Sequence, residues 1–253
     1  MIDLSKRVKN FIKNFLVKRG FRISKIGPYS IFDFESFLYR YLEVYKKFSF
    51  IQIGANDGVM NDPIYKFNMD NKSQVSGFVL EPLPDIYKKL VKNYESCSDI
   101  KPYNLAIHET ESEMILYRVK PTYASKIPEF AGGIASFDKS HWQKTDLIPD
   151  EDYMEEVTVK CTSFTNFISE NSINKIDLLL IDTEGYDYDI LMSIDFSMIK
   201  PKIIRFEHGL RNKVMTKDNF NRVCNHLNSF GYQIITESYD ATAYLLNPSD
   251  LTF

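Results

Sequence analysis

The sequence lacks the features that mark membrane-spanning and strongly basic proteins. No apolar run approaches the roughly 18–20 residues that a helix needs to cross a bilayer. Charged residues interrupt the N-terminal segment, so we expect no signal peptide. Lys and Arg number 31 against 34 for Asp and Glu, and the net charge of −3 argues against sequence-independent binding to nucleic acid, which needs a surplus of basic residues.

Cysteine is also scarce, and the few cysteines lie far apart in the chain. Cys97, Cys161 and Cys224 do not follow any spacing typical of metal ligands, so reduced thiols are the expected state. Together with the absence of a membrane-spanning run, this leads us to expect a cytoplasmic protein.

The sequence does contain enough apolar residues for one large core. Its 253 residues are 44% hydrophobic and 26% charged, which is typical of a soluble globular protein. That length accommodates one α/β domain with or without an insertion.

The first 25 residues form a basic segment, with eight Lys or Arg residues and one acid, Asp3. Five apolar residues in it recur at the spacing of one helical face: Val8, Phe11, Ile12, Phe15 and Leu16. We expect residues 1–48 to be an N-terminal helical extension that packs on the domain or on a second subunit of a homo-oligomer. Contact with a membrane surface or an anionic substrate is the alternative.

From Phe50 onward, apolar runs typical of strands alternate with amphipathic segments typical of helices. This alternation predicts that residues 49–253 are an α/β domain on a parallel sheet. The apolar run 176–181, interrupted only by Asp177, suits a central strand covered on both faces. The expected strands are 50–53, 77–80, 101–107, 113–119, 157–161, 176–181, 202–206, 232–236 and 243–246, the last two as an antiparallel edge hairpin. The expected helices are 31–45, 83–94, 163–170 and 217–229.

Residues 120–156 interrupt this alternation with prolines and a Gly132-Gly133 pair. Such a segment inside an α/β domain predicts a loop-rich insertion that acts as a lid. Ser136 and His141, which lie within it, are therefore candidates to contact the second substrate of an enzyme.

The most informative stretch is the apolar strand that ends in Gly54-Ala55-Asn56-Asp57-Gly58. This strand and its Gly-rich turn are followed by a second strand that ends in the acid Glu81. This order is typical of doubly wound sheets that bind a nucleoside cofactor. A dinucleotide would need Gly at position 56, and Asp57 would repel its pyrophosphate. No Lys-Ser or Lys-Thr pair follows the glycines, which excludes a P-loop.

S-adenosylmethionine has a ribose and an ammonium group but no phosphate, so it fits this loop best. We expect Gly54, Asn56, Asp57 and Gly58 to bind it, with Asp57 facing the ammonium group. Glu81 would accept hydrogen bonds from the two ribose hydroxyls.

Four segments then carry a resemblance to a known family. They are 51–58, Glu81-Pro82, Asn104-Leu105-Ala106, and 176–187 with its specific run Asp182-Thr183-Glu184-Gly185-Tyr186-Asp187. Together they resemble the FkbM-type S-adenosylmethionine-dependent methyltransferases. The resemblance implies a Rossmann-like class I fold with a seven-stranded, mostly parallel sheet, an antiparallel C-terminal strand and helices on both faces. It also implies methyl transfer to oxygen and cofactor contacts by Pro82, Asn104, Ala106 and Asp182.

The strands that end at Asp182 and Glu207 should be neighbours, with Glu207 and His208 facing the same crevice. One interpretation is a divalent metal, Mg²⁺ or Mn²⁺, held by Asp182, Glu207 and His208, which would lower the pKa of the attacking hydroxyl. The other is that His208 or Asp182 is a general base while the remaining groups orient the acceptor. Glu184, Tyr186 and Asp187 are further candidates for acceptor contact, Tyr186 by stacking on a sugar ring.

These observations predict an S-adenosylmethionine-dependent O-methyltransferase that acts on a sugar hydroxyl. By analogy with the family, the acceptor would be a nucleotide-linked sugar or a precursor of a surface glycan such as capsule or lipopolysaccharide. The alternatives are methylation of a small metabolite or polyketide, methylation of a protein carboxyl or amine, and a degenerate subunit that only binds the cofactor.

Overall fold

The chain divides into two compact units, Met1–Phe32 and Asp33–Phe253, and the computed structural model describes residues 32–144 and 147–245. The basic helix expected near residues 8–16, and any subunit contact through it, lie outside the described residues. All the described helices and strands belong to the second unit. Within its described part, no helix is both long and apolar enough to cross a membrane.

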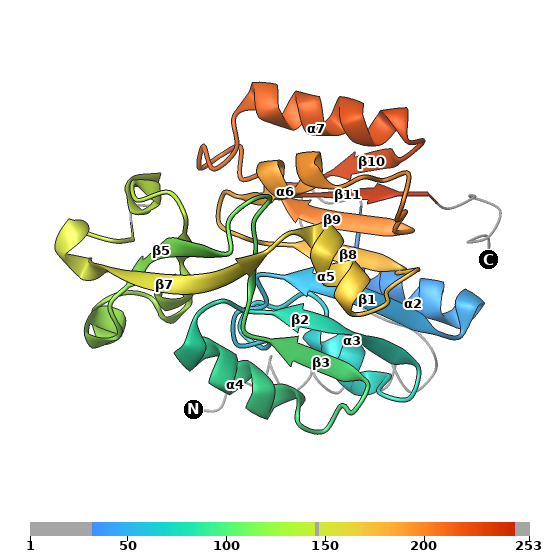
Figure 1. The fold of residues 1–253 in the computed structure, drawn as a ribbon, viewed down its shortest axis with the longest axis horizontal. Coiled ribbons are helices and arrows are strands. Elements are labelled where there is room, and N and C mark those ends of the chain that lie inside the picture. Colours follow the sequence, from blue (N-terminus) through green and yellow to red (C-terminus); the bar gives the residue numbers. More distant parts are fainter. Residues whose placement is uncertain (1–31, 145–146, 246–253) are drawn as a thin grey trace, which may run out of the picture. The chain divides into compact units, whose positions relative to one another are not determined.

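The central sheet has seven strands in the order β10-β11-β9-β8-β1-β2-β3 (Figure 1). They are β1 (Phe48–Ile53), β2 (Val75–Leu80), β3 (Ile100–Tyr103), β8 (Leu178–Ile181), β9 (Ile203–Glu207), β10 (Gln233–Thr236) and β11 (Asp240–Tyr244). β11 runs antiparallel to β9 and β10, and the other neighbouring pairs are parallel. The predicted seven-stranded, mostly parallel sheet is confirmed, with its switch point between β1 and β8.

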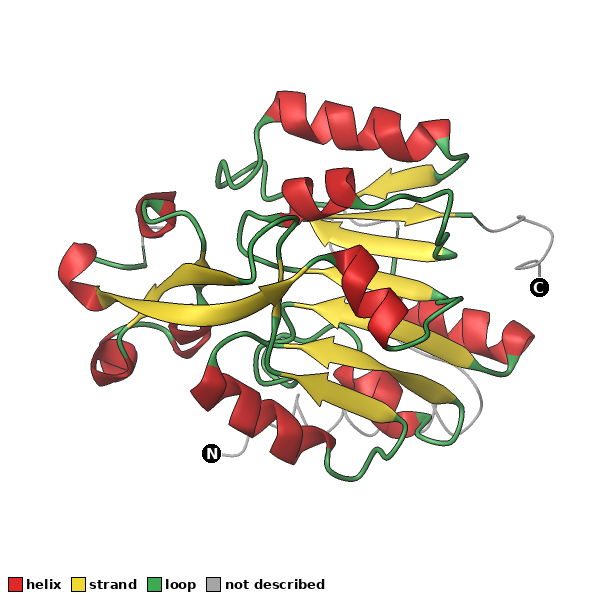
Figure 2. Cartoon of the chain, viewed as in Figure 1, coloured by secondary structure: helices red, strands yellow, loops and turns green. Residues whose placement is uncertain are grey.

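Alternation of side chains along β1 explains why helices cover both faces of this sheet. The Phe48 ring packs against Tyr41 of α2 (Phe34–Tyr45) and Phe67 of α3 (Tyr65–Asp70), with centroids 5.7 and 5.1 Å apart. Ile51 and Ile53 point the other way, into the core cluster formed with α5 (Phe164–Glu170), α6 (Asp187–Ser193) and α7 (Lys217–Ser229). Figure 2 shows helices on both sides of the strands, as predicted.

The α2 helix is part of the same compact unit as the sheet. Its N-cap is Asp33, whose side chain accepts the backbone N–H of Ser36 at 3.2 Å. The Tyr41 hydroxyl donates to Asp177 at 2.7 Å, just before β8 begins. This buried hydrogen bond connects α2 to the amino ends of the central strands.

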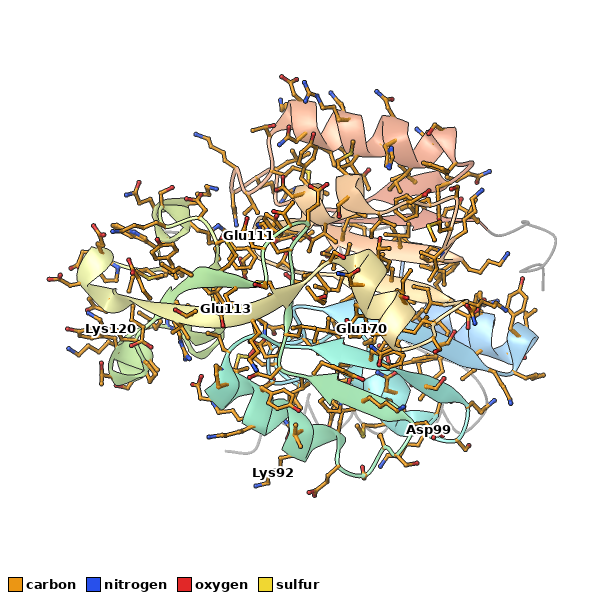
Figure 3. All side chains as sticks on the ribbon, viewed as in Figure 1. Lys92, Asp99, Glu111, Glu113, Lys120 and Glu170 are labelled. Atoms are coloured by element: carbon orange, nitrogen blue, oxygen red, sulfur yellow. The ribbon has the colours of Figure 1, made fainter. Side chains whose placement is uncertain are left out.

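A second sheet of four strands, in the order β4-β7-β5-β6, projects from the carboxyl ends of the central strands (Figure 1). It consists of β4 (Ala106–Ile107), β5 (Glu113–Val119), β6 (Ala135–Ser136) and β7 (Met154–Thr162). We call residues 113–162 the arm. Lys120 lies far out on the arm, whereas Glu170, at the end of α5, lies over the central sheet (Figure 3). The strands expected at 113–119 and 157–161 exist, and they belong to the arm.

Between its strands the arm contains the short 3-10 helices η1 (Pro121–Lys126), η2 (Glu129–Gly133), η3 (His141–Lys144) and η4 (Glu151–Tyr153). These pack on a small apolar cluster of their own that includes Val119, Ala131 and Ile148. The arm is tied to α4 (Pro84–Tyr94) because buried Arg118 pairs with Asp85.

The prediction of a single strand at 101–107 is wrong. The chain leaves the central sheet after Tyr103 and joins the second sheet at Ala106. Between them, the amide of Asn104 donates to the carbonyls of Glu81 and Pro82, at 2.9 and 2.8 Å. The side-chain hydrogen bonds of Asn104 therefore hold the chain in a bend that an apolar pattern does not show.

Candidate active site

Two adjoining cavities open at the carboxyl ends of β1, β2, β8 and β9, at the switch point of the sheet. The first cavity encloses about 730 Å³ and the second about 960 Å³, both open to solvent. Five residues line both cavities and form their shared wall: Gly54, Asn56, Gly133, Asp182 and Glu184. The wall thus combines the loop after β1, the loop after β8, and the arm.

Gly54 allows the loops after β1 and β8 to approach each other. Its φ is +80°, and a Cβ built on it would lie 1.8 Å from the carbonyl oxygen of Asp182. No other residue type fits a positive φ with this contact. Gly54, one of the residues predicted to contact the cofactor, lines both cavities.

The first cavity combines one buried carboxylate with apolar walls. Glu81, 6% exposed at the end of β2, accepts the N–H of Leu83 at 2.8 Å. Burial raises the pKa of Glu81 to about 7, against the opposing effect of backbone hydrogen bonds from Leu83 and Asn56. Leu105 and Ile107 are among the apolar residues that line the same cavity. Pro82 and Ala106, also predicted here, line the same cavity.

Three residues predicted to contact the cofactor line neither cavity. The carboxylate of Asp57 accepts the N–H groups of Val59 and Met60, at 2.9 and 2.8 Å, so it caps a turn. A Cβ on Gly58 would lie 2.7 Å from atoms of α4, so this glycine serves close packing. Asn104 holds the chain bend described above. These positions differ from the predicted contacts, because backbone groups engage the side chains of Asp57 and Asn104, and packing against α4 engages Gly58.

The second cavity is lined largely by polar side chains, and some have no partner. The Gln52 amide donates to Asp62 at 2.6 Å, which leaves Gln52 Oε1 buried without a hydrogen bond. Nδ1 of His141 and Oε2 of Glu207 are likewise buried without a partner. All four residues line this cavity. Because unpaired buried polar atoms are costly, they indicate a place where a polar ligand binds.

The acids of the second cavity influence one another. Burial, with repulsion from Asp182 and Glu184, raises the pKa of Glu207 to about 9. Burial also raises the pKa of Asp62 to about 6. Protein atoms surround Asp182 closely, but the residue is exposed where it borders both cavities. Burial and then the carboxylate of Glu184 raise its pKa, and its exposure opposes the effect of burial. A ligand carrying hydroxyl or ammonium donors would relieve this crowding of acids.

The predicted metal site is not assembled. In residues 32–144 and 147–245 no group of three or more His, Cys, Asp or Glu side chains is placed to hold a metal ion. Asp182 and Glu207 do meet in the second cavity, but His208 lines neither cavity. Its Nδ1 accepts the N–H of Leu210 at 3.2 Å and its Nε2 lies 3.3 Å from the carbonyl of Glu237. Because backbone groups occupy both ring nitrogens, His208 is not placed as a ligand or a base.

The candidate acceptor residues separate into three groups. Glu184 and His141 line the second cavity. Tyr186 lines the first cavity instead, stacked on His108 with centroids 5.2 Å apart, so it is not placed to stack on an acceptor in the second. Asp187 and Ser136 line neither, and both hold backbone: the Ser136 hydroxyl donates to the Glu184 carbonyl at 2.7 Å.

Several cavity residues were not expected from the sequence: Gln52, Asn61, Asp62, Gly133, Lys144 and Asn212. One signal was present, because Gln52 is a polar residue near the end of a mostly apolar strand. No sequence signal marked Gly133, because its role depends on a close contact in the folded chain. A Cβ at this position would lie 2.4 Å from the Asn56 amide nitrogen.

Residues 52–234 match the family model described as "Methyltransferase FkbM domain". No curated protein matches the chain.

Similar solved structures include methyltransferase FkbM from Methylobacillus flagellatus KT, at 11% identity and a TM-score of 0.47, covering 79% of this chain and 44% of that one. The O-methyltransferase from Bacillus cereus in complex with SAH is 7% identical, with a TM-score of 0.44 over 97% and 93% of the two chains. Fibrillarin from Methanococcus jannaschii is 11% identical, with a TM-score of 0.42 over 79% and 67%.

Proposed function

Because the chain belongs to the FkbM methyltransferase family, we propose that its two cavities hold the two reactants of a methyl transfer, with S-adenosylmethionine in the first and a sugar hydroxyl in the second. The shared wall is the observation that carries this proposal. Asp182 and Glu184 border both cavities, so groups bound on either side meet there.

The residues of the first cavity fit S-adenosylmethionine. Glu81 offers a buried carboxylate to the ribose hydroxyls, and Leu105 and Ile107 offer an apolar surface to the adenine. Asp182, at the shared wall, supplies negative charge near the cationic end of the cofactor. When bound, S-adenosylmethionine supplies an electrophilic methyl group. The protein's task is then to align a nucleophile with it and to exclude water.

A sugar suits the second cavity because its walls offer many hydrogen-bond acceptors. The unpaired Gln52 Oε1 and the carboxylate of Glu184 match a ligand rich in hydroxyl groups. The carboxylate of Glu184 also repels phosphate, so a nucleotide-linked sugar would extend its diphosphate away from that residue. We therefore favour the sugar residue of a cytoplasmic surface-glycan precursor, such as one for capsule or lipopolysaccharide, with an uncharged or amine-bearing ring in the cavity.

Two measurements test this function. Calorimetry with S-adenosylmethionine should give one site per chain, and absence of binding at high micromolar cofactor would remove the enzyme hypothesis. Incubation with methyl-labelled cofactor and a panel of free, lipid-linked and nucleotide-linked sugars, followed by product mass and NMR, should place the label on a sugar oxygen. A label found on a carboxyl, an amine or a polyketide instead would contradict the sugar assignment and leave methyl transfer intact.

A further inference from the structure

One histidine of the arm is paired with an acid of the central sheet. Nε2 of His141, on η3, lies 3.1 Å from Oε2 of Glu184, in the loop after β8. A carboxylate oxygen accepts this hydrogen bond when Nε2 is the protonated ring nitrogen, and this is the tautomer that we assign to His141. In the neutral ring, Nδ1 is then an acceptor with a free lone pair.

That free nitrogen belongs to a side chain of the second cavity. His141 is 2% exposed, lines this cavity, and its Nδ1 has no hydrogen-bond partner. Gly185 lies next to it: a Cβ built on that glycine would be in ordinary van der Waals contact, 3.6 Å from Nδ1. A basic nitrogen that is buried, oriented by a carboxylate and unpaired is the arrangement that general-base catalysis uses.

Backbone contacts keep both partners in place. The N–H of His141 donates to the Asp138 carbonyl at 3.0 Å, and Lys144, one turn later on η3, donates to the Asp138 carboxylate at 2.9 Å. The Ser136 hydroxyl donates to the Glu184 carbonyl at 2.7 Å. The arm therefore supplies the imidazole and also fixes the backbone of the acid that orients it.

We propose that His141 is the general base of this methyltransferase and that Glu184 is the residue that positions it. The inference rests on the proposed function. The acceptor oxygen forms its bond to the methyl carbon, and the carbon–sulfur bond breaks with its electron pair moving to sulfur. The hydroxyl proton passes to Nδ1 of His141, whose Nε2–H stays bonded to Glu184. The proton leaves to water once product departs.

The other candidate bases are less well placed. Backbone groups occupy both nitrogens of His208. Burial and neighbouring acids raise the pKa of Glu207 to about 9, so it holds a proton at neutral pH and is not free to accept another. Asp182 borders both cavities and is therefore an alternative candidate for the general base. The kinetics of variants at Asp182 and His141 distinguish the two residues.

Kinetics of matched variants give the first test, with the best sugar of the panel as acceptor. His141→Gln keeps an amide donor toward Glu184 but has no basic nitrogen, so we expect kcat to fall by about 10²–10⁴-fold, with S-adenosylmethionine affinity and acceptor KM changed by less than about threefold. His226→Gln, on α7 and outside both cavities, should keep the wild-type kcat. Near-wild-type turnover by His141→Gln, with turnover abolished in Asp182→Asn, would overturn the proposal in favour of Asp182.

The tautomer of His141 gives a second test that needs no acceptor. The protein has 4 histidines, so ¹⁵N-histidine labelling and the loss of signals in His141→Gln identify the ring of interest. We expect a protonated Nε2 and a bare Nδ1 in the wild type. In Glu184→Gln a measurable fraction of the proton should move to Nδ1, and kcat should fall, because a neutral amide no longer requires a donor. A purely structural role of Glu184 would not move the tautomer, and Glu170→Gln should not move it either.

These outcomes distinguish a failure of the proposed function from a failure of the proposed general base. A wild-type protein that does not bind S-adenosylmethionine would overturn the proposed function and the base with it. A wild-type protein that binds and transfers methyl, but carries the His141 proton on Nδ1 or loses no rate in His141→Gln, would overturn the base alone.

Discussion

The buried carboxylate of Asp187 accepts the backbone N–H of Glu207 at 3.0 Å. Its other oxygen accepts the N–H and hydroxyl of Thr183, at 3.1 and 2.6 Å. One side chain thus joins the loop after β8 to the end of β9, directly behind the shared wall. Burial raises the pKa of Asp187 to about 6, so it is ionised at neutral pH and can accept all three hydrogen bonds.

Replacing Asp187 with Ala should therefore disturb both stability and catalysis. We expect the free energy of unfolding to fall by about 3 kcal/mol, because charge-assisted hydrogen bonds are lost and three donors are left unpaired. Urea titration measures this loss. Asp189→Ala, which removes an exposed acid of the same helix, should change stability by less than about 0.5 kcal/mol. Equal effects of the two substitutions would contradict the bridging role.

Gly54 and Gly132 form a second matched pair. A Cβ at Gly54 would collide with the Asp182 carbonyl, whereas nothing lies within 4 Å of one at Gly132. Gly54→Ala should cost about 3 kcal/mol or more of stability and weaken cofactor binding, because the strained loop must open the shared wall. Gly132→Ala should leave both unchanged. Thermal melts and calorimetry measure the difference, and a stable, cofactor-binding Gly54→Ala would show that the two loops are free to separate.

Glu81 is expected to contribute affinity for S-adenosylmethionine. In Glu81→Gln the charge-assisted hydrogen bonds to the ribose are lost, so the dissociation constant should rise by about 10–100-fold, at about 1.5–3 kcal/mol per bond to a charged group. Glu170→Gln, on the surface at the end of α5, is the matched control and should bind like the wild type. Unchanged affinity in Glu81→Gln would place the ribose elsewhere.

The raised pKa of Glu207 makes stability depend on pH. With the pKa of this acid raised to about 9 in the folded state, the folded protein keeps a proton that the unfolded chain releases near its ordinary pKa of 4.5. Between these values the folded state binds more protons, so stability must fall as pH rises. Asp62 and Asp187, with pKa values of about 6, add to this only below neutral pH.

Glu207→Gln should remove the alkaline part of that dependence. We expect the variant and the wild type to melt together near pH 5, and the variant to melt several degrees higher near pH 9, since each kcal/mol shifts Tm by about 2–4 °C in a protein of this size. Melting curves across this range provide the measurement. Parallel curves for the two proteins would mean that Glu207 titrates normally in the folded state.

Much of the fold followed from local patterns. The unbroken apolar run that contains β8, the capping Ser163 before α5, and the amphipathic α7 each act over a few residues, so their elements were predictable. The bend at Asn104 was not, because its hydrogen bonds reach back to Glu81 and Pro82. Nothing near Asn104 in the sequence shows these partners.

Site residues were predictable where a particular residue type is required at the end of a strand. They were not predictable where nearby backbone groups compete with a ligand for the same side chain. Gly54, Glu81 and Asp182 line the cavities as expected. Asp57 was expected to face the cofactor, yet two adjacent N–H groups occupy its carboxylate. A sequence pattern identifies a charged residue, but it does not show which nearby N–H group donates a hydrogen bond to it.

By itself, the sequence determined the α/β class, the family, and the strand ends where the site forms, because periodicity and turn chemistry are local properties of the chain. Only the tertiary structure decided which of these side chains face a cavity. It placed His141 of the arm 3.1 Å from Glu184 of the central sheet and turned His208 toward backbone groups. The physical reason is that the direction and protonation of an imidazole depend on which groups lie within about 3 Å of its nitrogens, and folding brings those groups from distant parts of the chain.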